Sequence, residues 1–248
     1  MNPQKNLNVI ISGSRGRMGT IIARLVKESE GLVLAGEAEK DLPLESVIDK
    51  GDVVIDFTVH DAAARNVAIA AHHGRPMVIG TTGLSKDEES IIKKASTSIP
   101  IVYSSNMSIG VNVMWKIVET AARVLAPKFK VDIVETHHTK KLDRPSGTAK
   151  KILDIVLAQG GWKMDRDVFF YEEKCAEPAA AGPVSVCSFR KGEVVGDHTI
   201  HFTSSGESIE ITHHAFNREV FAQGALVAAK WIVGKPPGLY GMADVLNI

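Results

Sequence analysis

Histidines, cations and hydroxyls gather in one short segment, Glu135–Lys150. It holds the adjacent His137 and His138, then Lys141, then a Ser146-Gly147-Thr148 step that opens a helical pattern. Free backbone N–H groups at a helix start bind anions, and a nearby lysine adds a full positive charge. A histidine beside such a site can act as a general acid near neutral pH. The segment therefore predicts a site for a small carboxylate or dicarboxylate, although a solvated basic loop before a capped helix explains the composition nearly as well.

A glycine-rich motif, residues 13–19, reads Gly-Ser-Arg-Gly-Arg-Met-Gly and separates an apolar run, residues 8–12, from a helical pattern over 20–27. Glycines at this junction allow a tight turn and let the backbone approach a pyrophosphate at the helix start. A dinucleotide fingerprint also needs an acidic residue about 20 positions further on. Glu37 and Glu39 both stand in that window. The pattern predicts a dinucleotide site, with a plain strand-to-helix turn as the alternative.

The cofactor preference depends on the neighbours Glu39 and Lys40. A carboxylate accepts hydrogen bonds from a ribose 2′-hydroxyl and repels a 2′-phosphate, whereas a base does the opposite. Arg15 and Arg17 add two cations from the glycine loop. The mixture predicts that both NADH and NADPH are accepted, and a solvated turn pair is the alternative for Glu39 and Lys40.

Short apolar strands alternate with helical patterns through the first hundred residues. The expected strands are 8–12, 32–36, 53–58, 76–80 and 99–103, and the expected helices are 20–27, 61–73 and one capped by Ser85. This alternation predicts a parallel sheet covered on both faces. Ligands bind at the carboxyl ends of such strands. We therefore expect residues 56–58, 80–83 and 104–107 around one crevice, although 80–83 could equally be a plain turn.

The pattern changes after about residue 106. Helices are expected over 111–125 and 147–159, and strands over 130–136, 184–190, 194–202 and 208–213. Such a run of strands predicts an antiparallel or mixed sheet in a second domain. A helical pattern returns over 219–231 and is ended by Pro236-Pro237-Gly238.

The composition excludes several classes of protein. Lys+Arg and Asp+Glu are both 29 in 248 residues, and no basic stripe is present, which argues against a nucleic-acid partner. No apolar stretch reaches the roughly 18 residues of a membrane span. The two cysteines, Cys175 and Cys187, form neither a CxxC motif nor a close pair. With no secretory leader before them, they predict a reduced, cytoplasmic protein.

Histidine pairs recur at 72–73, 137–138 and 213–214, and His198 and His201 add two more. Neighbours on a strand point to opposite faces, so a pair does not readily share one metal ion. The chain has no HExxH and no CxxC motif. We therefore expect no metal.

Taken together, these motifs resemble the bacterial dihydrodipicolinate reductases, also called 4-hydroxy-tetrahydrodipicolinate reductases, of lysine biosynthesis. The resemblance covers nearly the whole chain. It rests on the Gly-Arg-Met-Gly ending of the glycine loop, on His-His-x-x-Lys followed by Asp-x-Pro-Ser-Gly-Thr, and on segments 56–58, 80–83, 105–112, 196–199, 210–213 and 224–240.

The resemblance implies an α/β protein with two domains. Residues 1–107 and 215–248 would form a Rossmann-like dinucleotide-binding domain. Residues 108–214 would form a central α+β domain with a mixed sheet, for substrate binding and for assembly into a homotetramer. The implied activity is NAD(P)H-dependent reduction of 4-hydroxy-tetrahydrodipicolinate to tetrahydrodipicolinate in the diaminopimelate route to lysine.

The resemblance also implies roles for individual residues. The cofactor-binding set is Gly13, Arg15, Gly16, Arg17 and Met18 for the pyrophosphate, Glu39 and Lys40 for the adenosine ribose, and Gly80, Thr82, Ser104, Asn106 and Met107 around the nicotinamide. Phe57 and Thr81 also belong to the cofactor-binding set. The set that binds the substrate's carboxylates is His138, Lys141, Ser146, Gly147 and Thr148. His137 and Lys141 form the catalytic pair, and which of them donates the proton stays open.

One segment departs from the family's pattern, and two other functions share part of the motif set. Residues 172–183 are acidic and alanine-rich where many members carry a basic, glycine-rich loop, which puts substrate contacts from this loop in doubt. Another nicotinamide enzyme of amino-acid metabolism would share the glycine loop but lack the His-His-x-x-Lys run. A nonenzymatic nucleotide-binding module would not need a cationic proton donor beside an anion site. The segment 135–148 disfavours both alternatives.

Overall fold

The computed structural model describes residues 6–126, 128–172 and 182–248 and divides into two units. The first comprises residues 1–109 and 218–248, and the second comprises residues 110–217. The atypical segment 172–183 falls almost wholly outside the described residues. Within the described ranges, no helix is both long enough and apolar enough to cross a bilayer.

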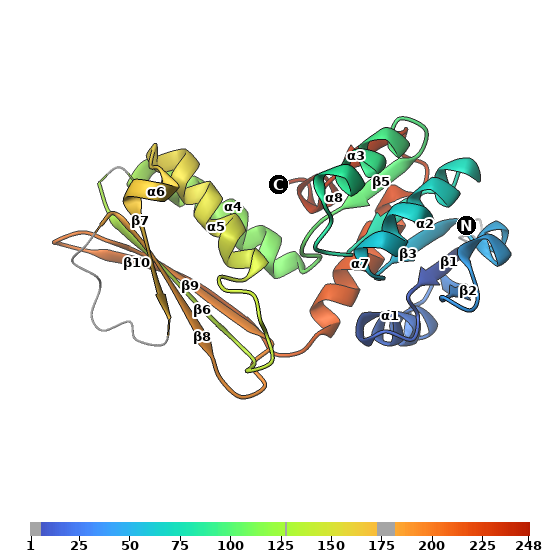
Figure 1. Ribbon diagram of the computed structural model, residues 1–248, viewed down its shortest axis with the longest axis horizontal. Coiled ribbons are helices and arrows are strands. Elements are labelled where there is room, and N and C mark those ends of the chain that lie inside the picture. The colour runs from blue at the N-terminus through green and yellow to red at the C-terminus, as the bar shows by residue number, and fades with distance from the viewer. Residues whose placement is uncertain (1–5, 127, 173–181) are drawn as a thin grey trace. The chain divides into compact units, whose positions relative to one another are not determined.

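The first unit is built on a six-stranded parallel sheet in the order β11-β5-β4-β3-β1-β2 (Figure 1). Its strands are β1 (Leu7–Ser12), β2 (Leu32–Ala38), β3 (Val53–Asp56), β4 (Met77–Ile79), β5 (Pro100–Tyr103) and β11 (Gly238–Tyr240). Its helices are α1 (Arg17–Glu28), α2 (His60–His72), α3 (Lys86–Ala95), α7 (Glu219–Ile232) and α8 (Met242–Leu246), with short 3₁₀ turns at Leu44–Ser46 and Ile48–Lys50.

Both faces of this sheet are covered, because successive residues of a strand point to opposite sides. In β1, Val9 and Ile11 belong to the apolar cluster that contains α1 and α7, whereas Ile10 belongs to the cluster that contains α2. The strands therefore read as continuous apolar runs, as predicted for a parallel sheet. The predicted cap of α3 is also confirmed: Ser85 Oγ accepts a hydrogen bond from the Glu88 N–H, and the Glu88 carboxylate accepts one from the Ser85 N–H.

The C-terminal tail adds more than the predicted helix. After α7 the chain forms β11, which pairs in parallel with β5 and extends the sheet by one strand. Helix α8 follows, and its Met242 and Val245 are buried in the same cluster as α1 and α7. Three residues are too few to show a strand periodicity, so the sequence predicted only the end of the helix here.

The second unit has a mixed sheet in the order β10-β9-β6-β8-β7, as predicted. Its strands are β6 (Lys130–His137), β7 (Val168–Glu172), β8 (Val184–Arg190), β9 (Gly196–Thr203) and β10 (Ser208–Ala215). Strands β6 and β8 are parallel, and β6 and β9 are antiparallel. The helices are α4 (Ile109–Leu125), α5 (Gly147–Gly160) and the short α6 (Met164–Asp167).

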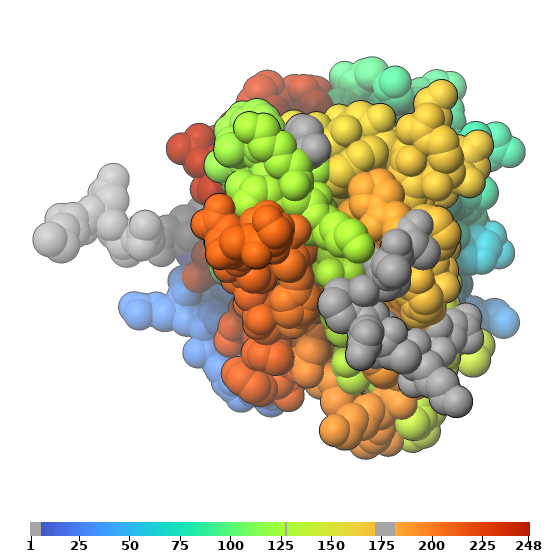
Figure 2. Space-filling view, turned by 90° about the vertical axis from the view of Figure 1, so that its left-hand side faces the viewer, coloured from blue at the N-terminus to red at the C-terminus, as the bar shows by residue number. Residues whose placement is uncertain are grey.

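Helices α4 and α5 pack on one face of this sheet (Figure 1). Val118 of α4 and Ile152 of α5 share a buried cluster with Ile133, Ile200 and Phe202 from the strands. No helix in the described ranges covers the opposite face, and Figure 2 shows the outer strand β10 (dark orange) at the surface of the unit.

Cys187 corrects one expectation. It is buried in β8 and is disulfide-bonded, and the described residues include no free cysteine. The prediction of reduced cysteines is therefore wrong in this structure.

Candidate active site

The glycine loop lies where β1 is flanked by β2 on one side and β3 on the other, the point at which the strand order of the sheet reverses. Gly13 has φ +79°, and a side chain there would lie 2.7 Å from the Phe57 carbonyl oxygen. A side chain at Gly19 would lie 2.0 Å from the Gly13 carbonyl oxygen. Gly16 caps helix α1, which begins at Arg17. The loop therefore requires glycine at both close approaches, and its helix start suits a pyrophosphate.

Glu39 folds back onto this loop. Its Oε1 accepts a hydrogen bond from the Arg15 N–H at 2.6 Å and one from the Ser14 hydroxyl at 3.3 Å. Lys40 is exposed. The structure thus brings the predicted ribose-binding carboxylate against the predicted pyrophosphate loop.

Asp41, which no sequence motif indicated, pairs with Arg15. The Arg15 guanidinium donates to both carboxylate oxygens of Asp41, at 2.9 and 3.0 Å. Hydrogen bonds from Arg15 hold the pKa of Asp41 below its usual value. One cation of the glycine loop is therefore already matched by a neighbouring anion.

The loop after β4 is built on a buried aspartate that the sequence analysis did not assign. Asp56, at the end of β3, accepts hydrogen bonds from the hydroxyls of Thr58 and Thr81 and from the Asn66 amide, at 2.7 to 2.8 Å. The predicted cofactor residue Thr81 is therefore buried, with its hydroxyl committed to Asp56. Thr82, next to it, is exposed.

The remaining predicted cofactor residues also follow strand ends. The Phe57 ring lies against Gly80, where a side chain would meet the ring at 2.2 Å. Ser104 donates to the Asn106 carbonyl, and Asn106 Oδ1 accepts from the Ser108 N–H at 2.9 Å ahead of α4. Met107 is buried in the core of the first unit. These loops share the carboxyl edge of the sheet, as predicted, but Met107 contributes packing to the core.

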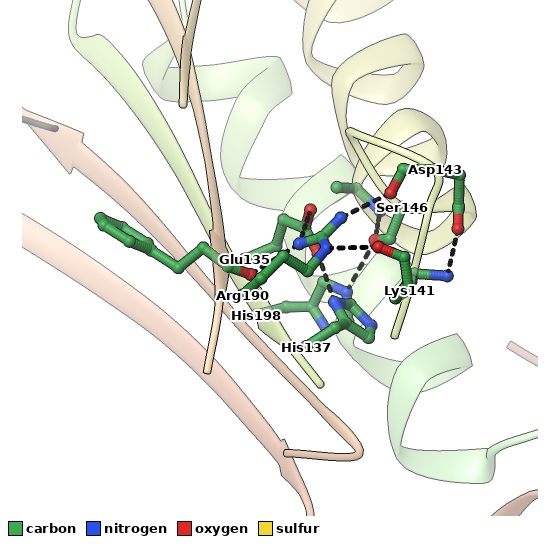
Figure 3. A network of polar contacts seen from close by, with 9 residues as sticks. Glu135, His137, Lys141, Asp143, Ser146, Arg190 and His198 are labelled. Atoms are coloured by element: carbon green, nitrogen blue, oxygen red, sulfur yellow. Dashed lines mark hydrogen bonds and ion pairs between the residues drawn. The ribbon is translucent and has the colours of Figure 1, made fainter. Parts of the chain in front are cut away.

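The second unit gathers its charged side chains at the ends of three strands (Figure 3). Glu135 and His137 lie two residues apart on β6, so they share a face. In the sheet register, His198 on β9 pairs with Glu135, and Arg190 on β8 pairs with His137. The Glu135 carboxylate contacts His137 Nδ1 with one oxygen and accepts a hydrogen bond from the Arg190 guanidinium at 3.0 Å with the other. The side chains of Glu135 and Arg190 are 0% and 3% exposed.

Burial and pairing act in opposite directions on Glu135. Burial raises its pKa, but hydrogen bonds from His137, Ser188 and Arg190 outweigh burial and lower the pKa to about 2. At His198 the two causes act in the same direction. Burial and the neighbouring His137 both lower the pKa of His198, to about 3. At neutral pH, Glu135 is therefore ionised and His198 is neutral. His198 Nε2 lies 3.2 Å from the Ser146 hydroxyl.

The loop between β6 and α5 carries Lys141 and ends at the start of a helix. Lys141 Nζ pairs with Asp143 Oδ1 at 2.8 Å. Burial raises the pKa of Asp143, but the Lys141 bond and charge outweigh it and hold the pKa below its usual value. Ser146 caps α5 by accepting a hydrogen bond from the Ala149 N–H, and space is open at Gly147, where a side chain would meet no atom within 4 Å. His138 and Thr148 are half-buried in the same segment.

Glu135, His137 and His198 also form a candidate metal set, with ligand atoms within 4.8 Å of one another. Zinc uses such ligands. Here one oxygen of the carboxylate accepts from Arg190, the other contacts His137 Nδ1, and His198 Nε2 lies 3.2 Å from the Ser146 hydroxyl. A second group, His60, Asp61 and Glu88, is exposed on the first unit, and Glu88 serves in the cap of α3.

The class of protein follows from the two units taken separately. One is a parallel dinucleotide-binding sheet with a glycine loop at its switch point. The other holds a buried histidine–carboxylate–arginine network beside an open helix start and a lysine. Such a pair of units defines a two-domain, dinucleotide-dependent oxidoreductase.

Comparison with known proteins identifies the family. Residues 7–107 match the model of the dihydrodipicolinate reductase N-terminus, and residues 110–246 match that of its C-terminus. The chain is 40% identical over 263 residues to the 4-hydroxy-tetrahydrodipicolinate reductase of Anaeromyxobacter sp. (strain Fw109-5), covering 98% of each chain. It is 40% identical over 265 residues to the enzyme of that name from Syntrophus aciditrophicus, covering 97% of this chain and 98% of the relative.

A solved structure shows the same fold. The dipicolinate-bound dihydrodipicolinate reductase from Paenisporosarcina sp. TG-14 has a TM-score of 0.79 and 24% identity, covering 97% of this chain and 99% of that chain. The chain belongs to the dihydrodipicolinate reductase family. It is an NAD(P)H-dependent oxidoreductase of the diaminopimelate route to lysine.

Sequence reasoning assigned no role to Arg190, Glu135 or His198. The alternation within 130–137 could have indicated that Glu135 shares a face with His137. Arg190 ends a predicted strand, but nothing local shows that this strand is the parallel neighbour of β6. That pairing joins residues about fifty positions apart.

Proposed function

We propose that the chain reduces 4-hydroxy-tetrahydrodipicolinate to tetrahydrodipicolinate with NADH or NADPH, and that His137 and Lys141 handle the proton. The reaction adds one hydride and one proton and releases water. When bound, the reduced nicotinamide supplies the hydride. The observation that carries the proposal is the buried His137–Glu135 pair beside Lys141 and the open start of α5.

The anion site is assigned to the start of α5. Backbone N–H groups at Gly147 and Thr148 bind a carboxylate with help from the helix dipole. Lys141 adds a full charge, and a substrate carboxylate would take the place that Asp143 now holds on its ammonium group. His138 and Ser146 complete the set as polar neighbours.

The proton comes from the His137–Lys141 pair. Hydride addition leaves negative charge on the substrate, and a cation close by stabilises that charge and can supply the proton. Glu135 contacts His137 Nδ1 directly and so fixes the orientation of the imidazole ring. Lys141 is 23% exposed and keeps an anion partner, so it is suited to charge stabilisation.

The first unit fits the dinucleotide. Gly13, Gly16 and Met18 would hold the pyrophosphate together with Arg15 and Arg17. Glu39 would accept from the adenosine ribose, since only its Oε1 is used by the loop. The loops that contain Phe57, Gly80, Thr82, Ser104 and Asn106 would hold the nicotinamide end.

Assembly and compartment are also proposed. Among the described residues of the second unit, helices cover one face of the sheet and none covers the other, and strand β10 lies at the surface (Figures 1 and 2). We assign the uncovered face to contacts between copies of the chain in a homotetramer, to be checked by light scattering. The biosynthetic role of the family supports the cytoplasm as the compartment, where a disulfide such as that of Cys187 is unusual. Cell fractionation checks this proposal.

A coupled assay tests the proposed activity. Aspartate semialdehyde, pyruvate and the preceding synthase generate the substrate, and NAD(P)H consumption is followed at about 340 nm. The wild-type chain should consume NAD(P)H above the synthase-only control, and failure to do so rejects the proposal. His137→Gln and Lys141→Ala should each lower kcat, with His201→Gln as a matched histidine control on the same sheet. Near-normal kcat in His137→Gln beside an inactive Lys141→Ala would reassign the proton to Lys141.

A further inference from the structure

Arg190 makes contacts in three directions from one buried guanidinium (Figure 3). Its Nε donates to the Lys141 carbonyl at 3.1 Å. A terminal nitrogen donates to the Asp143 carbonyl, and the other donates to Glu135 and to the Phe189 carbonyl. One side chain therefore joins β6, β8 and the loop that carries Lys141.

Glu135 forms the second half of this arrangement. It accepts from Arg190 on one oxygen and contacts His137 Nδ1 with the other. A carboxylate held in this way fixes the rotation of the imidazole and keeps a proton on Nδ1. The charged or titratable groups around His137 are Glu135 on its own strand, Arg190 on β8, His198 on β9 and Lys141 on the loop.

From these contacts we propose that Arg190 and Glu135 are positioning residues for both proton-handling groups. Glu135 orients His137, and Arg190 anchors the Lys141 segment by two main-chain carbonyls while holding Glu135 in place. This assignment rests on the proposed roles of His137 and Lys141. The Arg190 guanidinium would thereby fix the distance between His137 on β6 and Lys141 on the loop.

The first test needs no substrate, so it is independent of the proposed activity. Histidine-labelled protein is examined by ¹⁵N NMR at one fixed pH, with the His137 signals assigned by their loss in His137→Gln. In Glu135→Gln the ring-nitrogen shifts of His137 should change, because the carboxylate that holds a proton on Nδ1 is gone. In Arg190→Met they should change as well, because Glu135 is no longer held in place. Unchanged His137 ring-nitrogen shifts in Glu135→Gln would overturn the proposal.

The second test separates charge from anchoring. Arg190→Lys keeps the positive charge near Glu135 but cannot hold both carbonyls in a fixed fork. We expect its His137 ring-nitrogen shifts to stay close to wild type while kcat falls about 10- to 100-fold, the range typical when a group that orients a functional residue is replaced. Wild-type kcat in Arg190→Lys would overturn the anchoring role.

Two controls keep the interpretation clear. Arg166 makes a bidentate pair with Asp167 in the same unit and is largely exposed, so Arg166→Gln should leave kcat and the His137 ring-nitrogen shifts unchanged. The double variant Glu135→Gln/Arg190→Met leaves no unpaired buried charge and should fold, as circular dichroism can verify. Wild-type kcat in that folded double variant would show that the pair is only structural and would overturn the proposal. If wild-type protein reduces nothing but the His137 ring-nitrogen signals change as described, the positioning geometry holds and the assigned activity fails.

Discussion

Alanine at position 196 would place a methyl group against the imidazole of His137. Gly196 begins β9, and a Cβ built there lies 2.9 Å from His137 Nε2 and 3.3 Å from its Cδ2. Ordinary contact begins at 3.4 Å, so the closest approach is about half an ångström too short. The imidazole cannot simply retreat, because Glu135 contacts its Nδ1 and the His198 ring packs edge-on at a centroid distance of 5.1 Å.

The size of the effect follows from that displacement. A misplacement of 1 Å in a catalytic constellation can cost about 100-fold in rate, so half that distance corresponds to roughly 10-fold in kcat. Overpacking a well-packed site costs about 1–3 kcal/mol of stability. We therefore expect Gly196→Ala to fold, to unfold at a lower urea concentration than wild type, and to lose about 10-fold in kcat with little change in KM.

The assay is steady-state NAD(P)H consumption, paired with urea unfolding of the same preparation. Gly206→Ala is the matched control, because Gly206 lies in the turn after β9 and a Cβ there meets no atom within 4 Å. Wild-type kcat in a folded Gly196→Ala variant would falsify the placement of His137 at the reacting centre. A loss of activity in both variants would point to the hairpin rather than to the imidazole.

Three further predictions address the cofactor, the buried histidine and metal dependence. Glu39→Ala should lower kcat/KM for NADH more than for NADPH. Asp41→Asn should raise the ratio of kcat/KM for NADPH to that for NADH, because it releases Arg15. Equal effects on both cofactors would argue against these contacts. In the folded state His198 has a pKa of about 3, whereas in the unfolded chain its pKa is near 6.5. Between these values the unfolded chain binds more protons than the folded chain. The free energy of unfolding therefore falls as the pH drops from 6.5 to 3. Urea unfolding should show a flatter profile over that range for His198→Gln than for wild type or His201→Gln, by up to about 1.4 kcal/mol per pH unit. Dialysis against EDTA should leave kcat unchanged, and restoration of a lost activity by added zinc would contradict that expectation.

Local patterns were sufficient for much of the architecture. The glycine loop predicts its own turn because Gly13 requires a positive φ and Gly19 a close approach, both properties of the residue type. Ser85 and Ser146 predict the starts of α3 and α5 because a hydroxyl satisfies the first free N–H groups of a helix. Continuous apolar strands predict a sheet covered on both sides, and the two apolar clusters that divide β1 confirm it.

The partners of these motifs were not predictable in the same way. Asp56 lies in an apolar strand and shows its importance only when Asn66 and Thr81 converge on it. The pairing of Arg15 with Asp41 crosses from one loop to another. Strand β11 is too short to carry a periodicity, and its place depends on the edge that β5 offers.

The sequence by itself determined which residue types were present to do chemistry, where the turns and helix starts fall, and that the strands of the first unit must be buried on both faces. Those features depend on the conformational limits of each residue and on the spacing of its near neighbours. Only the tertiary structure decided that Arg190 and His198 stand beside Glu135 and His137. Strand register places these four residues side by side. The register depends on the packing of the whole sheet and not on any local segment.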